Sequence, residues 1–150
     1  MNDVKSILVP IDFSGNTEKV LAAATTMAQK FEAEIHLIYV AESLGEYATF
    51  AIPHISTDVL AEEMLQQAKV KMNHFLDHHR EAEKDIKCVG EVLQGDDAAK
   101  EITDYAKANK IGMIVMGTHG YKGLEKTLMG SVADKVLRTA PCPVTVIKPD

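Results

Sequence analysis

The residues best suited to chemistry are the glycines and the serine of one segment near the C-terminus. This segment contains Gly117, Gly120 and Gly130, and Ser131 directly follows the last of these glycines. Glycine permits positive φ and lets a ligand approach the backbone closely. If Gly130 and Ser131 open a helix, the first amides of that helix lack internal partners and, with the helix dipole, favour a phosphate. The spacing therefore predicts a phosphate-binding loop, to which Ser131 adds a hydroxyl.

This loop matches neither of the two common phosphate motifs. It is not a P-loop, and Gly117, Gly120 and Gly123 have the wrong spacing for the dinucleotide fingerprint. Lys122 and Lys126 add positive charge within it. Two plainer interpretations stay open: the loop is a simple connection, and Ser131 is only a helix N-cap.

A second candidate segment follows the first apolar run, Ile7–Ile11, and begins with Asp12. In open α/β sheets, ligands bind beyond the carboxyl ends of the strands at a topological switch point. If this run and the run that ends before Gly117 are neighbouring strands, Asp12 and Gly117 line one crevice. The alternative is that Asp12 caps the first helix or binds backbone amides in a turn.

Both segments are positioned by strands that alternate with helices. Short, β-branched apolar runs predict buried strands at 7–11, 35–40, 86–93, 113–116 and 144–147. Apolar residues at helical spacing predict helices at 20–31, 57–83, 98–108 and 130–139. Residues 41–56 fit neither pattern and predict a mobile connection. The alternation predicts a mostly parallel sheet with helices on both faces.

Composition narrows the classes of protein. The chain has 150 residues, 46% of them hydrophobic, and a net charge of −6, which predicts one domain over residues 1–150. Lysines and arginines are scattered, so neither a nucleic-acid nor a membrane partner is expected. The N-terminus has no signal-peptide pattern, no run reaches membrane-spanning length, and the only cysteines, Cys88 and Cys142, suggest no disulfide framework. A cytoplasmic location is therefore expected.

Three stretches resemble the universal stress protein family, in its ATP-binding form. The spacing glycine, two residues, glycine, nine residues, Gly-Ser looks like the nucleotide signature of that family. The opening Ile7–Ser14 resembles its first strand and acidic end. The stretch from Gly130 through Pro141-Cys142-Pro143-Val144 is also similar.

The resemblance implies a five-stranded sheet of order 3-2-1-4-5, which places the first and fourth strands side by side. It implies that Asp12 holds the ribose or adenine, and that Val40 and Pro10 line the adenine pocket. The residues implied to contact ribose and phosphates are Gly117, Thr118, Gly120, Gly130, Ser131 and Val132. A divalent ion such as Mg²⁺ or Mn²⁺, when present, is expected on the phosphates. A homodimer through the last strand is implied as well, because an edge strand carries unpaired backbone groups.

No catalytic residue and no metal ligand is assigned. His119 reads as an exposed loop residue, and His74, His78 and His79 as a solvated helix face rather than a metal pair. Three functions stay open: a nucleotide-dependent regulatory module, a slow ATPase or self-phosphorylating enzyme, and an interaction protein that binds no nucleotide.

Overall fold

A computed structural model of the protein describes residues 3–42, 57–118 and 129–149. The predicted mobile connection therefore lies mostly outside the described residues, except that Ala41 and Glu42 continue a strand. Gly120, His119, Lys122 and Lys126 also lie outside them.

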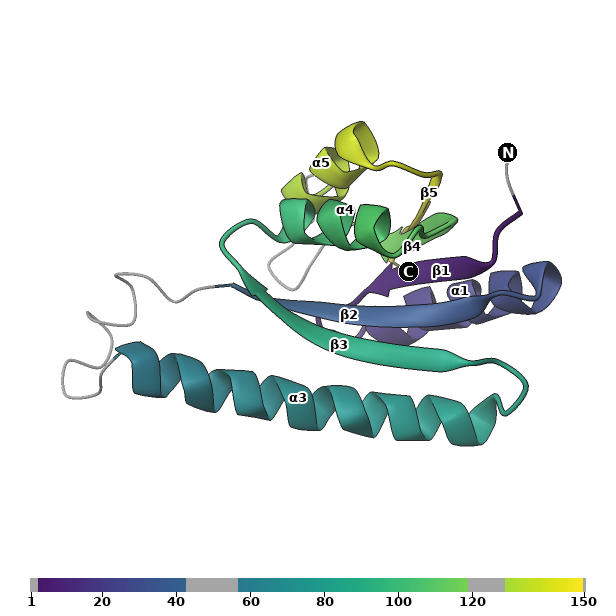
Figure 1. Ribbon diagram of the computed structural model, residues 1–150. Coiled ribbons are helices and arrows are strands. Elements are labelled where there is room, and N and C mark those ends of the chain that lie inside the picture. The colour runs from purple at the N-terminus through teal and green to yellow at the C-terminus, as the bar shows by residue number, and fades with distance from the viewer. Residues whose placement is uncertain (1–2, 43–56, 119–128, 150) are drawn as a thin grey trace.

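Five parallel strands form one sheet in the order β3-β2-β1-β4-β5, which confirms the expected fold (Figure 1). Their bounds are β1 Ser6–Pro10, β2 Glu34–Glu42, β3 Cys88–Gly95, β4 Met113–Gly117 and β5 Val144–Ile147. The central strands β1 and β4 are almost wholly buried, as their unbroken apolar runs predict for strands covered on both faces.

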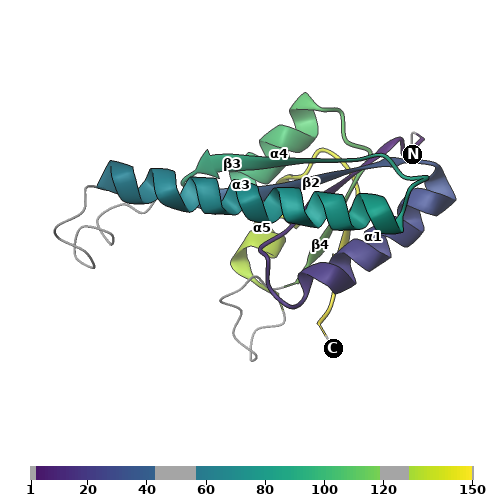
Figure 2. The same cartoon turned by 90° about the horizontal axis from the view of Figure 1, so that it is seen from below.

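Helices cover both faces of the sheet, as Figures 1 and 2 show together. Their bounds are α1 Thr17–Phe31, α3 Thr57–Ala82, α4 Ala98–Ala108 and α5 Ser131–Thr139. Successive residues of each strand point to opposite faces of the sheet, so each strand contributes to two hydrophobic cores. Val9, Ile35 and Leu37 pack with α1 and α3, whereas Leu8, Ile38 and Ile114 pack with α4 and α5.

The N-terminal part of α3 extends past the end of the sheet (Figure 2). Apolar residues follow helical spacing along the whole of this helix, but the buried ones are concentrated toward its C-terminal half. Met72 and Leu76 are buried, whereas Met64 is 49% exposed. The helix is amphipathic along its length, but its first turns extend past the sheet and have no strand to pack against.

The prediction that His79 lies on a solvated helix face is wrong. His74 and His78 are exposed, but His79 is buried against α1, where its Nε2 lies 3.1 Å from the hydroxyl of Thr25. His79 continues the helical spacing of Met72 and Leu76, so it shares their face. No group of metal-ligating side chains occurs among the described residues.

The two cysteines are free, and both behave as small apolar residues. Burial raises the pKa of the Cys88 thiol to about 11, against a smaller opposing effect of Arg80. Burial also raises the pKa of Cys142, which packs beside the α4 and α5 core. Within the described ranges, no helix is both long and apolar enough to cross a bilayer.

Candidate functional site at the carboxyl edge of the sheet

The carboxyl ends of β1, β2 and β4 bring three predicted site residues level with one another. β1 pairs with β4 in the register Ile7↔Met113, so five residues further along each chain Asp12 comes level with Thr118. β1 also pairs with β2 in the register Pro10↔Ile38, and the same counting brings Asp12 level with Val40. Asp12 thus follows a central strand, with Val40 on one side and Thr118 on the other.

Asp12 is held by its own turn. Its Oδ1 accepts a hydrogen bond from the backbone N–H of Ser14 at 2.9 Å and from the hydroxyl of Thr17 at 3.3 Å. This confirms that Asp12 binds a backbone amide in a turn, and it fixes the side chain at the start of α1. Its Oδ2 has no hydrogen bond to any residue in the described ranges, so this oxygen remains available as an acceptor.

The residue after Asp12 has an uncommon backbone conformation. Phe13 has a φ of 61°, in the left-handed region that an aromatic residue rarely adopts. Its ring packs 4.8 Å from that of Tyr39 and 5.6 Å from that of Phe75. Burial, with smaller effects of the Glu42 and Asp12 carboxylates, raises the pKa of Tyr39. Packing between β2 and α3 thus holds the turn that presents Asp12.

The N-terminus of α5 is tied directly to the end of β4. The N–H of Gly130 donates to the carbonyl of Thr118 at 2.6 Å, and the N–H of Thr118 donates to the carbonyl of Ile147 at 3.1 Å. Thr118 is buried, whereas Gly117 is half-buried. Residues 117, 118 and 130 are therefore brought together as the glycine spacing predicts, although the chain between 118 and 129 lies outside the described residues.

Gly130 is the N-cap of α5, and Ser131 is the first helical residue. The interpretation of Ser131 as an N-cap is therefore wrong. Gly130 has φ −71° and ψ 159°, so this position does not depend on the positive φ that glycine permits. The first helical bond runs from the N–H of Asp134 to the carbonyl of Gly130 at 3.0 Å. The amides of Ser131, Val132 and Ala133 consequently have no acceptor within the helix.

Pro10 and Val40 form the apolar side of this edge. Pro10 is the last residue of β1 and is half-buried, and Val40 pairs with Leu93 of β3. Val40 packs against the core under α4 and α5, which is the face that carries the N-terminus of α5. Apolar side chains thus stand on the β2 side of Asp12, and on the β4 side stands the first turn of α5, whose amides have no acceptor within the helix.

A groove lies at the opposite edge of the sheet, beside the amino ends of the strands. This groove of about 530 Å³ is lined by Lys5, Glu34, Asp85 and Lys87 among others. It contains none of the predicted site residues, and charges of both signs line it. The geometry and the predicted residues therefore point to the carboxyl edge instead.

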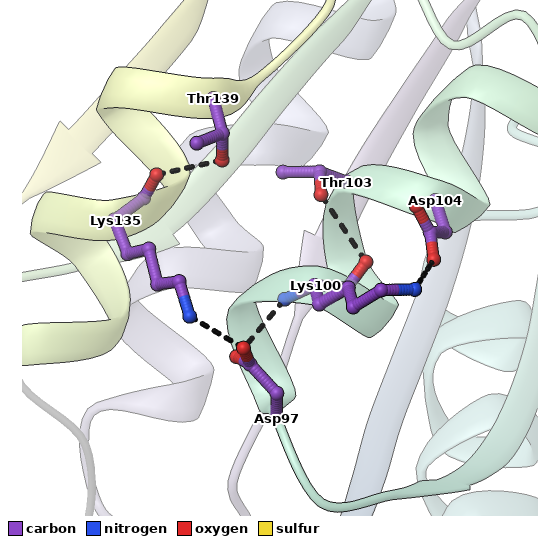
Figure 3. Close-up of polar contacts among 6 residues, drawn as sticks. All are labelled: Asp97, Lys100, Thr103, Asp104, Lys135 and Thr139. Carbon is purple, nitrogen blue, oxygen red and sulfur yellow. Dashed lines mark hydrogen bonds and ion pairs between the residues drawn. The ribbon is translucent and has the colours of Figure 1, made fainter.

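One ion pair near this edge joins two helices and could not be predicted from the sequence. Lys135 of α5 pairs with Asp97, which lies 38 positions earlier in the chain and caps α4 (Figure 3). The ammonium of Lys135, followed by the amide of Lys100, lowers the pKa of Asp97. The cap at Asp97 is a contact with a residue three positions along the chain, whereas no local pattern indicates its partner on another helix.

Comparison with known proteins identifies the family. The universal stress protein family matches residues 3–148. The chain is 37% identical to Universal stress protein MJ0531 of Methanocaldococcus jannaschii, over 98% of this chain and 84% of that protein. Among solved structures, universal stress protein UspA from Lactobacillus plantarum has a TM-score of 0.77 and 27% identity, covering 98% of this chain and 99% of that one.

Two further solved structures share the fold at lower identity, and each holds an adenine nucleotide. One is a universal stress protein in complex with cAMP, with a TM-score of 0.66, 16% identity, and coverage of 99% and 100% of the two chains. The other is the universal stress protein from Archaeoglobus fulgidus in complex with dAMP, with a TM-score of 0.60, 22% identity, and coverage of 98% and 100%. The nucleotides are properties of those proteins. The family match over nearly all of the sequence, together with the relative at 37% identity, shows that this chain belongs to the universal stress protein family.

Proposed function

We propose that this protein binds ATP, or another adenine nucleotide, at the carboxyl edge of its sheet and acts as a nucleotide-dependent regulatory module. The observation that carries the proposal is the hydrogen bond from Gly130 to Thr118, beside the level of Asp12. It brings the first turn of α5, whose amides at residues 131–133 have no acceptor within the helix, to the end of β4, and β4 is the neighbour of the strand that Asp12 follows. Amides at a helix N-terminus bind phosphate, and a carboxylate accepts hydrogen bonds from ribose hydroxyls or the adenine amine.

Each residue has a role that fits its place at this edge. Asp12 holds the ribose or adenine, while Pro10 and Val40 give the ring an apolar wall. The residues proposed to contact ribose and phosphates are Gly117, Thr118, Gly120, Gly130, Ser131 and Val132. A Mg²⁺ or Mn²⁺ ion that accompanies the nucleotide belongs on the phosphates. The cAMP and dAMP found in two relatives of the same fold support an adenine nucleotide as the ligand class.

The proposal extends to assembly and location. β5 is an edge strand of the sheet, and pairing with the β5 of a second copy would satisfy its outer backbone groups. We therefore propose a homodimer through β5. The two free cysteines, of which Cys88 is buried, suit the reducing cytoplasm.

Isothermal titration with ATP, ADP and AMP in the presence of Mg²⁺ tests the binding. Gly130→Val places a branched side chain beside the phosphates, so the affinity for ATP should fall more than tenfold, about 1.4 kcal/mol. Because the backbone of Gly130 lies in a region open to all residues, circular dichroism should show an intact fold. Thr139→Ala is the matched control, since it removes an exposed hydroxyl from the other end of the same helix. Absence of binding at millimolar nucleotide would overturn the proposal and favour a nucleotide-free interaction protein.

The same variant separates binding from catalysis. Phosphoryl transfer requires positioning and charge neutralisation, which a bound triphosphate at this edge would receive. ADP release by the wild-type protein well above that of Gly130→Val would support the ATPase hypothesis. Equal rates would reject it and leave the regulatory module.

A further inference from the structure

Lys135 on α5 pairs with a carboxylate that also caps the neighbouring helix α4. The Oδ1 of Asp97 accepts the N–H of Lys100 at 3.2 Å and so caps α4, while its Oδ2 pairs with the ammonium of Lys135. Figure 3 shows the lysine side chain leaving α5 sideways to reach the start of α4. Both side chains of this pair are substantially exposed, at 55% for Lys135 and 39% for Asp97. Exposed ion pairs are weak, so a stronger anion can take the lysine.

The position of Lys135 on the helix puts its ammonium within reach of a phosphate at the N-terminus of α5. Lys135 follows Ser131 by four residues, so both lie on the same face, one turn apart. A turn rises about 5.4 Å, and helical side chains lean toward the N-terminus. The four-carbon stem of lysine spans this rise. Rotation away from Asp97 would bring the ammonium level with the free amides of the first turn.

The charges around this end of the helix favour such a rotation when a polyphosphate is bound. The whole chain carries a net charge of −6, and both Asp12 and Asp97 lie at the carboxyl edge. The other described basic residue of α5, Arg138, lies in its last turn and pairs with Asp134 at 3.1 Å. A triphosphate carries several negative charges against the single charge of Asp97, so it attracts the lysine more strongly. AMP has no phosphate beyond the α-phosphate, so its binding gains less from Lys135.

We propose that Lys135 exchanges Asp97 for the distal phosphates of the nucleotide, and that this exchange makes the site prefer ATP and ADP over AMP. This inference rests on the proposed nucleotide site and adds a specificity-determining residue to it. Asp97 is then a positioning residue, which holds the lysine beside the site while no polyphosphate is bound.

The test is isothermal titration of ATP and AMP into wild-type protein, Lys135→Met and Lys100→Met. Lys100→Met is the matched control, because Lys100 is an exposed lysine near the same carboxylate but pairs with Asp104 at 2.7 Å on α4 (Figure 3). Both variants remove one positive charge. Lys135→Met should weaken ATP binding about tenfold and change AMP binding less than twofold, whereas Lys100→Met should leave the ratio of the two affinities unchanged.

A second variant tests the same exchange from the other side. Asp97→Asn keeps an oxygen that caps α4 but releases Lys135, so the preference for ATP over AMP should rise severalfold, and this rise should vanish in the Asp97→Asn, Lys135→Met double variant. Equal losses of ATP and AMP affinity in Lys135→Met, or an unchanged preference in Asp97→Asn, would overturn the role of Lys135 while the nucleotide site stands. Failure of the wild-type protein to bind either nucleotide would instead overturn the site itself.

Discussion

Acidification should destabilise this protein through His79. The hydroxyl of Thr25 donates to the carbonyl of Leu21 at 2.7 Å, so it accepts its second bond from the Nε2–H of His79 at 3.1 Å. The neutral imidazole therefore leaves Nδ1 without a proton, and this buried atom has no hydrogen-bond partner among the described residues. Protonation would bury both a charge and an N–H without an acceptor. Burial accordingly lowers the pKa of His79 from its ordinary value of 6.5; the charge of His78 adds to this effect and that of Glu83 opposes it.

The sign and size of the effect follow from proton linkage. Because the pKa of His79 is lower in the folded chain than in the unfolded chain, the unfolded chain binds more protons at this residue as the pH falls through 6.5, and the free energy of unfolding falls with it. Because one such group can change the free energy of unfolding by at most about 1.4 kcal/mol per pH unit, the loss between about pH 6.5 and 5.5 cannot exceed about 1 kcal/mol. Glu34 acts in a lower window: its pKa is lowered, chiefly by the hydrogen bond with His36, so its contribution is lost only as the pH falls below 4.5.

Urea unfolding followed by circular dichroism at pH 7.5, 6.5 and 5.5 measures this loss. His79→Phe keeps a ring in the core and removes the titration, so its free energy of unfolding should fall less than that of the wild type over the lower pH unit, by a difference of up to about 1 kcal/mol. His74→Gln, on the exposed face of the same helix, should follow the wild type. Parallel curves for wild type and His79→Phe would refute the reasoning. An NMR titration of the wild-type imidazole gives an independent check, and a midpoint at or above 6.5 would refute it as well.

Two further predictions concern the cysteines and the edge strand. Cys88 should react with a disulfide reagent at pH 8 only as fast as the protein unfolds, and Cys142 should react faster, because Cys88 is 3% exposed and has a pKa of about 11; equal rates for the two thiols would contradict this. The carbonyls of Pro143 and Ile147 face β4, so by alternation the N–H of Val146 faces outward, and Val146→Pro should convert a β5-paired dimer to a folded monomer in analytical ultracentrifugation. A wild-type monomer, or a variant that remains dimeric, would remove this interface.

Local patterns were enough to predict the helices and strands. Continuous apolar runs such as residues 113–116 identify strands buried on both faces. Local patterns do not predict the order of the strands, because the sequence of a single strand does not indicate which neighbour it pairs with. That order came from the family resemblance, and it is what places Asp12 level with Thr118.

The errors arise where tertiary packing decides. Met64 continues the apolar spacing of α3 but is exposed, whereas His79 is polar but lies on the buried face of Met72 and Leu76. Phe13 adopts a left-handed backbone while its ring packs against Tyr39 and Phe75, and nothing in the local sequence indicates this conformation. Lys135 and Asp97 meet across two helices, so their pairing depends on the packing of α4 against α5.

A crystal structure of the protein grown with ATP and Mg²⁺ tests the central claim most directly. We expect density for the phosphates within hydrogen-bond distance of the amides of residues 131–133, with the adenine ring between Val40 and Pro10 and a ribose hydroxyl or the adenine amine on the Oδ2 of Asp12. Density for the nucleotide at the opposite groove beside Lys5 and Lys87, or an empty carboxyl edge at millimolar ATP, would contradict the account.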